Sequence, residues 1–256
     1  MNNCINILWD IHNNPSAEFE NLLAQPEQVR DFPTDFASGQ EMQLKLLARW
    51  LESGERLGGW KIGMTSGASR NAMGEGIRPF GFILNSRIKT SADQLSVHDL
   101  HRGQIENELC FRLGSDLGAG ATEADAKRCV AEILPAFEIN QKRLNPDAPA
   151  ALRIADNLSN WGIVIGDPAP PTTDIENLTV TLSEGTRVIE EVVSAGHIDN
   201  HYASLAMLAN QLAQYGHTLA ADQYVITGAY GKTPFAPGSY QGHFDSGVGS
   251  VTTHLV

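Results

Sequence analysis

Two glutamates separated by one residue, Glu106 and Glu108, carry the clearest potential for chemistry in this sequence. The segment 105–113 alternates between apolar and polar residues, which predicts a β-strand. Residues i and i+2 of a strand point to the same face, so both carboxylates project together while Asn107 faces the other way. Two adjacent carboxylates repel unless they are exposed, protonated or neutralised by a cation. The pair alone therefore leaves two interpretations open, a solvent-facing strand edge and a cation site.

A third acidic residue, Glu138, favours the cation site. It follows the apolar run 134–137 within a predicted strand over 133–139, where a surface glutamate is out of place. Three carboxylates with water molecules form an all-oxygen site, which suits Mg²⁺ or Mn²⁺ better than zinc. We therefore predict that Glu106, Glu108 and Glu138 hold a divalent cation.

Lys61 lies among bulky apolar residues and glycines in the segment Gly59-Trp60-Lys61-Ile62-Gly63. A lysine drawn into a site in this setting loses solvent, which lowers its pKa and makes it a useful acid or base. The alternative is a lysine at a strand end that keeps its ammonium group in water, because lysine is rarely buried.

Two further polar clusters each allow a functional and a structural interpretation. Asp156-Asn157-Leu158-Ser159 precedes a predicted strand over 162–166 and forms either a polar lip on the site or an ordinary turn. His197-Ile198-Asp199-Asn200-His201 has a spacing that can bind metal when both histidines lie on one helix. Asp199 and Asn200 instead indicate a helix start, so the histidines flank its cap, and we favour a surface or packing role for them.

Composition and missing motifs argue against several classes of function. The 256 residues carry a net charge of −12, from 30 acidic and 18 basic residues, which disfavours nucleic-acid binding. No phosphate-binding loop, nucleophile elbow or dinucleotide fingerprint is present, so we expect no cofactor other than the cation. The three cysteines, Cys4, Cys110 and Cys129, fit neither a zinc spacing nor a closed disulfide framework. With no signal-peptide pattern and no apolar run of about 20 residues, we expect a soluble, cytoplasmic protein without membrane contacts.

Hydrophobic periodicity predicts the elements that position these residues. In the first half it predicts short helices and loops over 1–36, an amphipathic helix over 39–56, a strand over 59–64, a strand or hairpin arm over 80–88, a helix from the N-cap Thr122 to about Glu132, and a strand over 133–139 that Pro135 interrupts. In the second half it predicts strands over 178–182 and 186–193, a helix over 202–215 capped by Asn200, and strands over 223–227 and 248–255. Many strands with few helices predict an α+β fold rather than a wound parallel sheet. We expect one domain over residues 1–256, with a mainly helical part at 1–56 and a β-rich catalytic part at 57–256.

Several short motifs occur in one order along the chain. They are Gly59–Ser66, Arg78–Gly81, Ile105–Leu109, Leu134–Ile139, Ala155–Ser159, Leu208–Leu212, Ile226–Gly228 and Pro237-Gly238. Together they resemble the 2-keto-4-pentenoate hydratase and 4-oxalocrotonate decarboxylase family, part of the fumarylacetoacetate hydrolase superfamily. The likeness extends from about Gln40 to the C-terminus, and the ordered set is specific although each motif alone is modest.

The resemblance implies a mixed β-roll of the fumarylacetoacetate hydrolase C-terminal-domain type, with peripheral helices. It implies a metal held by the carboxylates that match Glu106, Glu108 and Glu138, an active-site lysine that matches Lys61 and a serine that matches Ser159. It also implies a homo-oligomer acting on a small 2-oxo or 2-hydroxy acid. The expected activity is a lyase of aromatic-compound catabolism, a hydratase that adds water to a 2-hydroxy-2,4-dienoate.

The sequence departs from the family at one position that bears on the reaction. Hydratases of the family carry an acidic residue immediately before the Phe-Gly pair that is Phe80-Gly81 here, and this chain has Pro79 at that position. A 4-oxalocrotonate-type decarboxylase therefore stays open as an alternative. A non-catalytic partner subunit of a hydratase–decarboxylase complex is a separate alternative from a different class of function. Hydrolytic cleavage of an acylpyruvate is a third option within the superfamily, and it requires a general base, often a His–Glu pair, that the sequence does not place.

Overall fold

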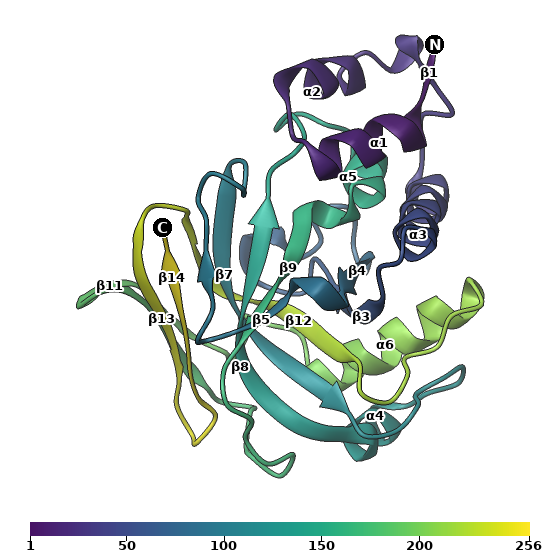
Figure 1. The fold of residues 1–256 in the computed structure, drawn as a ribbon. Helices are drawn as coiled ribbons and strands as arrows, with labels where there is room; N and C mark the ends of the chain where they lie inside the picture. The colour runs from purple at the N-terminus through teal and green to yellow at the C-terminus, as the bar shows by residue number, and fades with distance from the viewer.

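The computed structural model describes residues 1–256 and builds the chain from two β-sheets and two groups of helices (Figure 1). The larger sheet has seven strands in the order β4-β3-β12-β7-β8-β9-β5. Its strands are β3 (Leu57–Ile62), β4 (Phe80–Leu84), β5 (Ile88–Thr90), β7 (Gly103–Leu113), β8 (Val130–Gln141), β9 (Asn160–Ile165) and β12 (Tyr224–Pro234). The sheet is mixed, because β3 pairs with β12 and β5 with β9 in parallel while the other pairs are antiparallel. Its long central strands β7 and β8 curve strongly across the molecule (Figure 1).

The smaller sheet has five strands in the order β11-β10-β13-β14-β6. They are β6 (Gln94–Leu95), β10 (Thr179–Glu184), β11 (Arg187–Val193), β13 (Gly238–Phe244) and β14 (Gly249–Leu255). β13 and β14 pack against β8, so the two sheets share apolar side chains. The approach is close at Gly242, where a Cβ atom would lie 2.2 Å from Asn107 Oδ1 and 3.0 Å from the Phe137 ring of the larger sheet. Asn107 therefore faces the smaller sheet, on the side of β7 away from Glu106 and Glu108, as the strand alternation predicts.

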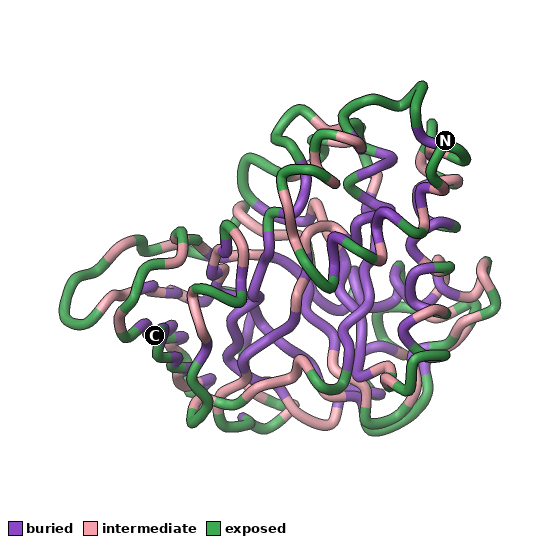
Figure 2. Tube along the Cα trace, turned by 45° about the horizontal axis from the view of Figure 1, so that its top comes forward, coloured by how far each residue is buried: buried purple, intermediate pink, exposed green.

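The helices form two groups at the ends of the larger sheet (Figure 1). One group contains α1 (Cys4–Asn13), α2 (Ala17–Leu23), α3 (Phe36–Glu52) and α5 (Ala150–Ala155), together with the two-residue strands β1 (Asn2–Asn3) and β2 (Val29–Arg30). The other contains α4 (Glu123–Cys129) and α6 (His201–Gln214), which pack on each other. None of these helices is both long and apolar enough to cross a membrane. Figure 2 shows the buried segments of the chain at its centre and the exposed segments around them. β7 and β8 consist mostly of buried residues, so the strands that carry the three glutamates lie inside this mixed α/β architecture.

Most of the predicted elements are present, but several boundaries are wrong. The helix predicted over 39–56 is α3 at 36–52, because Asp35 caps its N-terminus by accepting a hydrogen bond from Ser38 N at 2.8 Å. It ends before Gly54, which has a φ of 99°. The predicted caps Thr122 and Asn200 are confirmed, yet the first of these helices ends at Cys129 rather than about Glu132.

Three strand predictions are also wrong in extent. β8 runs without interruption through Pro135, because the Pro135 carbonyl accepts from Gly166 N at 2.9 Å just beyond the end of β9. β12 continues past residue 227 to Pro234. Gly228 and Gly231 do not end the strand, because their positive φ angles of 139° and 138° fall at two bulges in its pairing with β7. The segment predicted as one strand or hairpin arm over 80–88 divides into β4, a single 3₁₀ turn and β5, and β13 was not predicted at all.

Candidate functional site

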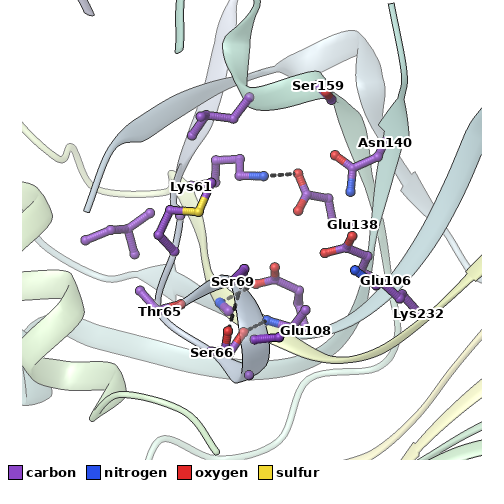
Figure 3. A pocket seen from close by; sticks show the side chains of 18 of the residues that line it. Lys61, Thr65, Ser66, Ser69, Glu106, Glu108, Glu138, Asn140, Ser159 and Lys232 are labelled. Carbon is purple, nitrogen blue, oxygen red and sulfur yellow. Dashed lines mark hydrogen bonds and ion pairs between the residues drawn. The ribbon is translucent and has the colours of Figure 1, made fainter. Parts of the chain in front are cut away.

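The three predicted carboxylates come together on the concave face of the larger sheet. Register between β7 and β8 places Glu106 directly opposite Glu138, and Glu108 lies two residues further along β7. One carboxylate oxygen from each of the three lies within 4.8 Å of the other two (Figure 3). Glu108 is 3% exposed and Glu138 1% exposed, so the alternative of a solvent-facing strand edge is wrong.

Hydrogen bonds from neighbouring strands fix the direction of two of these carboxylates. Gly228 N in β12 donates to Glu108 Oε2 at 2.6 Å. Asn160 Nδ2 at the start of β9 donates to Glu138 Oε1 at 2.8 Å, and Lys61 Nζ donates to the same oxygen. Supporting donors of this kind hold metal-ligating groups in a fixed orientation.

Burial and mutual repulsion raise the pKa values of two of the glutamates. Loss of solvent is the main cause of the raised pKa of Glu106, followed by the charge of Glu138. The pKa of Glu108 lies well above its ordinary value for the same two reasons, although Lys61 and the Gly228 hydrogen bond act in the opposite direction. Three clustered carboxylates, of which Glu108 and Glu138 are buried, fit a divalent cation together with one paired lysine, because oxygen donors are the ligands that Mg²⁺ and Mn²⁺ prefer.

Lys61 is buried at 7% exposure, so the interpretation of a lysine that keeps its ammonium group in water is wrong. It lies on β3 opposite Gly81 of β4. A Cβ atom at Gly81 would lie 3.0 Å from Lys61 Cγ, so the glycine leaves room for the lysine side chain to pass into the site.

The expected direction of the Lys61 pKa shift is wrong. Burial does lower the pKa, but Glu138, Glu108 and Glu106 together outweigh it and the pKa is raised. Lys61 Nζ therefore carries a proton at neutral pH and is held by Glu138.

Ser159 reaches the site from a left-handed turn. Asn157, Leu158 and Ser159 have φ angles of 57°, 52° and 64°, which L-residues rarely adopt in succession. Asn157 anchors the turn to β4, since its Oδ1 accepts from Phe82 N at 2.8 Å and its Nδ2 donates to Phe82 O at 2.9 Å. Such strain persists only where the surroundings enforce it.

Buried Arg143 holds both ends of this turn. Its Nη2 donates to Asp156 O at 2.9 Å and to Asn160 O at 3.2 Å, and its Nε donates to Asp156 Oδ1 at 2.8 Å. His12 Nε2 in α1 also donates to Asp156 Oδ1 at 3.0 Å. Burial, followed by the charge of Arg143, lowers the pKa of His12 to about 4, so His12 is a neutral donor. Asp156 is therefore part of this internal support, and the predicted polar lip is wrong for Asp156 and for the buried Asn157.

The carboxylates, Lys61 and Ser159 line one pocket of about 470 Å³ (Figure 3). Asn140 also lines it, at 5% exposure and with no hydrogen-bond partner for its side-chain amide. Sequence reasoning missed Asn140, although its position two residues after Glu138 on a strand places both side chains on one face. It also missed three exposed cations of the lining, Lys142, Arg153 and Lys232.

The two histidines of the His197–His201 segment have different environments. His201 is buried, with Nδ1 bonded to Thr227 Oγ1 at 2.7 Å and Nε2 to Tyr230 Oη at 2.6 Å. Burial lowers its pKa to about 4, so it is a neutral packing residue, as predicted. His197 lines the pocket, and its Nε2 donates to Ala229 O at 3.0 Å. No carboxylate is hydrogen-bonded to His197, so the His–Glu pair expected of a hydrolase is not formed.

Comparison with known proteins places this chain in a family. No protein-family model matches the chain. The chain is 30% identical over 205 residues to the 2-keto-4-pentenoate hydratase of Paraburkholderia phymatum, an alignment that covers 78% of each protein. This chain belongs to the 2-keto-4-pentenoate hydratase and 4-oxalocrotonate decarboxylase family. Another relative, the 4-oxalocrotonate decarboxylase of a Pseudomonas species, is 29% identical over 212 residues, which cover 80% of this chain and 81% of the relative.

The fold agrees with this family membership. The solved structure of 4-oxalocrotonate decarboxylase from Pseudomonas putida G7, complexed with magnesium and adipate, matches with a TM-score of 0.87. The match covers 99% of this chain and 96% of that one at 23% identity, so it shows a shared fold. The family resemblance inferred from the ordered motifs is therefore confirmed.

Proposed function

We propose that this chain is a divalent-metal-dependent hydratase, a lyase that adds water to a 2-hydroxy-2,4-dienoate and gives a 4-hydroxy-2-oxo acid during aromatic-compound catabolism. The observation that carries the proposal is the set of three carboxylates, two of them buried, with oxygens within 4.8 Å of one another, in one pocket with a protonated Lys61. The relatives support it, because their names describe hydratases and decarboxylases of small 2-oxo acids.

Each residue of the site has a distinct role in this proposal. Glu106, Glu108 and Glu138 would hold the cation, and when bound, Mg²⁺ or Mn²⁺ supplies a Lewis acid for the C1 carboxylate and C2 oxygen of a 2-oxo acid. Lys61 Nζ moves a proton between the enol and keto forms along the conjugated chain. The Ser159 hydroxyl hydrogen-bonds the substrate carboxylate or the attacking water, which adds to C4.

A 4-oxalocrotonate-type decarboxylase is the second candidate, and Pro79 favours it. Pro79 offers the site no acidic group, and its carbonyl accepts from Gly63 N at 2.7 Å. The nearby carboxylate of Asp199 is paired with Arg78 at 2.8 Å and with Arg70 at 3.2 Å, so it does not replace the missing acid. In a decarboxylase, the distal carboxylate leaves as CO₂ and its electrons move along the conjugated chain to the C2 oxygen, so both reactions share one set of ligands.

The proposal also includes the domain organisation, the type of β-sheet fold and the oligomeric state. Residues 1–256 form one domain, with a helical part at 1–56 and a catalytic part at 57–256, and one continuous apolar cluster joins residues of both parts in support of this. The curved larger sheet and its packing on the smaller sheet support the β-roll of the fumarylacetoacetate hydrolase C-terminal-domain type. Association into a homo-oligomer stays a prediction, which light scattering coupled to gel filtration measures.

The test of the reaction uses two substrates with Mg²⁺ or Mn²⁺ present. The enzyme is incubated with 2-hydroxypenta-2,4-dienoate and with 2-oxo-3-hexenedioate, and ultraviolet absorbance loss and CO₂ release are recorded. Absorbance loss without CO₂ identifies the hydratase, whereas CO₂ from the second substrate identifies the decarboxylase. Whichever of the two activities the enzyme has, the Glu106→Gln variant is expected to lose it. Full activity of this variant would contradict the proposed metal site.

A non-catalytic partner subunit is the remaining alternative. A subunit without catalysis has no need to keep Lys61 and all three glutamates within reach of one another, and this chain keeps them. Calorimetric titration of the metal-free protein with Mn²⁺ distinguishes the two, because absence of binding would favour the non-catalytic role.

A further inference from the structure

His12 is a buried titratable residue that no step of the proposed reaction uses. It lies in the last turn of α1, before the region of family likeness that begins near Gln40, and its side chain is fully buried. Its Nε2 lies 3.0 Å from Asp156 Oδ1, across 144 residues of the chain. This contact ties the N-terminal helix α1 to the segment that carries Ser159. A buried carboxylate that loses one of its donors is costly, so the contact constrains both partners.

Asp156 and Arg143 carry this constraint to the left-handed turn. Asp156 Oδ1 accepts from His12 Nε2 and from Arg143 Nε at 2.8 Å, so two donors fix the carboxylate from two elements. Arg143 Nη2 then donates to the carbonyls of Asp156 and Asn160, the residues at the two ends of the turn. Because His12 is neutral, it donates to the carboxylate without adding a positive charge beside Arg143. The three side chains therefore act as one clamp on the turn.

Ser159 is the residue of the turn that depends most on this clamp. Asn157 and Asn160 have side-chain anchors of their own, on β4 and β8. Ser159 has no such anchor, and its backbone N donates to Asp156 O at 3.3 Å, a long hydrogen bond to the carbonyl that Arg143 holds. Its φ of 64° is unfavourable for an L-residue. When the carbonyl of Asp156 is released, Ser159 is free to return to an ordinary conformation, which moves its hydroxyl out of the pocket that it lines.

We propose that His12 is a positioning residue, which holds Ser159 in the pocket through Asp156 and Arg143. The inference rests on the proposed function, in which the Ser159 hydroxyl hydrogen-bonds the substrate or the attacking water. It gives α1 a part in the reaction, although no residue of this helix lines the pocket. His12 should act without changing the metal site, since the three glutamates lie on β7 and β8.

The experiment compares His12 variants of the full chain with Mn²⁺ present. His12→Leu removes the donor and should lower kcat/KM about 10-fold, the factor that corresponds to one hydrogen bond, for whichever of the two substrates the wild type converts. Calorimetry should give an unchanged Mn²⁺ affinity. His12→Gln should restore most of the activity, because its amide nitrogen can take the place of Nε2. In a Ser159→Ala background, His12→Leu should change kcat/KM by less than about twofold, since its effect passes through Ser159.

A second measurement follows the turn itself, independently of turnover. Hydrogen exchange of the backbone amides of residues 156–160, measured by mass spectrometry, should be about 10-fold faster in His12→Leu than in the wild type. Ile7→Val is the control for a weakened α1, because Ile7 is buried five residues before His12, on a different side of the helix. It should leave both kcat/KM and this exchange rate unchanged.

Several outcomes would overturn the inference. They are full kcat/KM in a folded His12→Leu protein, an equal loss in the Ser159→Ala background, and the same loss in Ile7→Val. If His12→Leu does not fold, His12→Asn gives the same comparison, because its shorter side chain does not extend to the Nε2 position. A wild type that converts neither substrate contradicts the proposed function instead, and the exchange rates then decide whether His12 holds the turn.

Discussion

Removing one charge from the carboxylate cluster should have opposite effects with and without metal. The change is Glu108→Gln, which keeps the size of the side chain and an oxygen that can accept the hydrogen bond from Gly228 N at 2.6 Å. Without metal, the variant loses the repulsion between Glu108 and two other carboxylates. With metal, it loses a charged ligand. We therefore expect the variant to be more stable than the wild type in chelator and to gain much less from Mn²⁺.

The size of the first effect follows from the geometry. At the 4.8 Å limit of the oxygen separations, one pair of unit charges repels by about 3 kcal/mol at an effective dielectric constant of about 20. Glu108→Gln removes two such pairs and one attraction to Lys61 of similar size, and proton uptake by the wild type limits the difference further. A gain of about 1–3 kcal/mol in the free energy of unfolding is expected, or roughly 2–10 °C in Tm for a chain of this length.

The second effect follows from mass action. At a metal concentration of about 100 times Kd, binding stabilises the wild type by about 2.7 kcal/mol, and the variant should show little of this at the same concentration. Differential scanning calorimetry at pH 8, with chelator and with Mn²⁺, measures both. Glu41→Gln is the matched control, since Glu41 is exposed on α3. A Glu108→Gln protein that is less stable than wild type in chelator and keeps its full metal-induced shift would refute the reasoning.

Other predictions follow from the groups around the cluster. Lys61→Met should lower kcat by about 10²- to 10⁴-fold because it removes the proton donor, while calorimetry still detects Mn²⁺ binding. Arg143→Met leaves the buried Asp156 carboxylate without a cation, with only the neutral His12 as donor, and should destabilise the fold by about 3–5 kcal/mol in guanidinium denaturation; adding Asp156→Asn should restore part of this, and no rescue would contradict the assigned pairing. Burial holds the pKa of His12 at about 4 instead of 6.5, so the unfolded chain binds more protons between these pH values. His12 should therefore lower the free energy of unfolding by about 3 kcal/mol between pH 6.5 and pH 4, and His12→Gln should lose less stability over this range by about that amount.

Much of the site could be predicted from local sequence, because its key residues lie on strands. The i, i+2 spacing of Glu106 and Glu108 and the apolar run before Glu138 were sufficient to predict the cluster, and the structure brings the three together. Asn140 could have been found by the same rule, since it shares a face with Glu138. Lys142 could not, because a lysine after a strand is exposed in most proteins, and its place beside a pocket depends on the fold.

The boundaries that were wrong share a physical cause. Pro135 and Gly228 are poor strand residues by local propensity, yet both lie within strands of the larger sheet. Tertiary pairing overrides propensity at both positions: the Pro135 carbonyl pairs with Gly166 N, and Gly228 uses its positive φ to direct its N–H at Glu108. The residues that disrupt the local pattern are therefore the ones that shape the site, and propensity alone cannot show this.

The curvature of the sheet is the feature that sequence could not supply, and the ion pair between Lys61 and Glu138 depends on it. β12 and β7 lie between β3 and β8 in the sheet order. In a flat sheet, strands three positions apart are separated by about 14 Å, and side chains that stand roughly perpendicular to the sheet do not meet across that distance. The two are nevertheless bonded, so β3 must curl toward β8. The irregular steps of β12 at Gly228 and Gly231 lie between them, and such bulges bend a sheet. The same bends that direct Gly228 N toward Glu108 thus bring Lys61 to the carboxylates and raise its pKa, which reverses the shift that burial alone predicts.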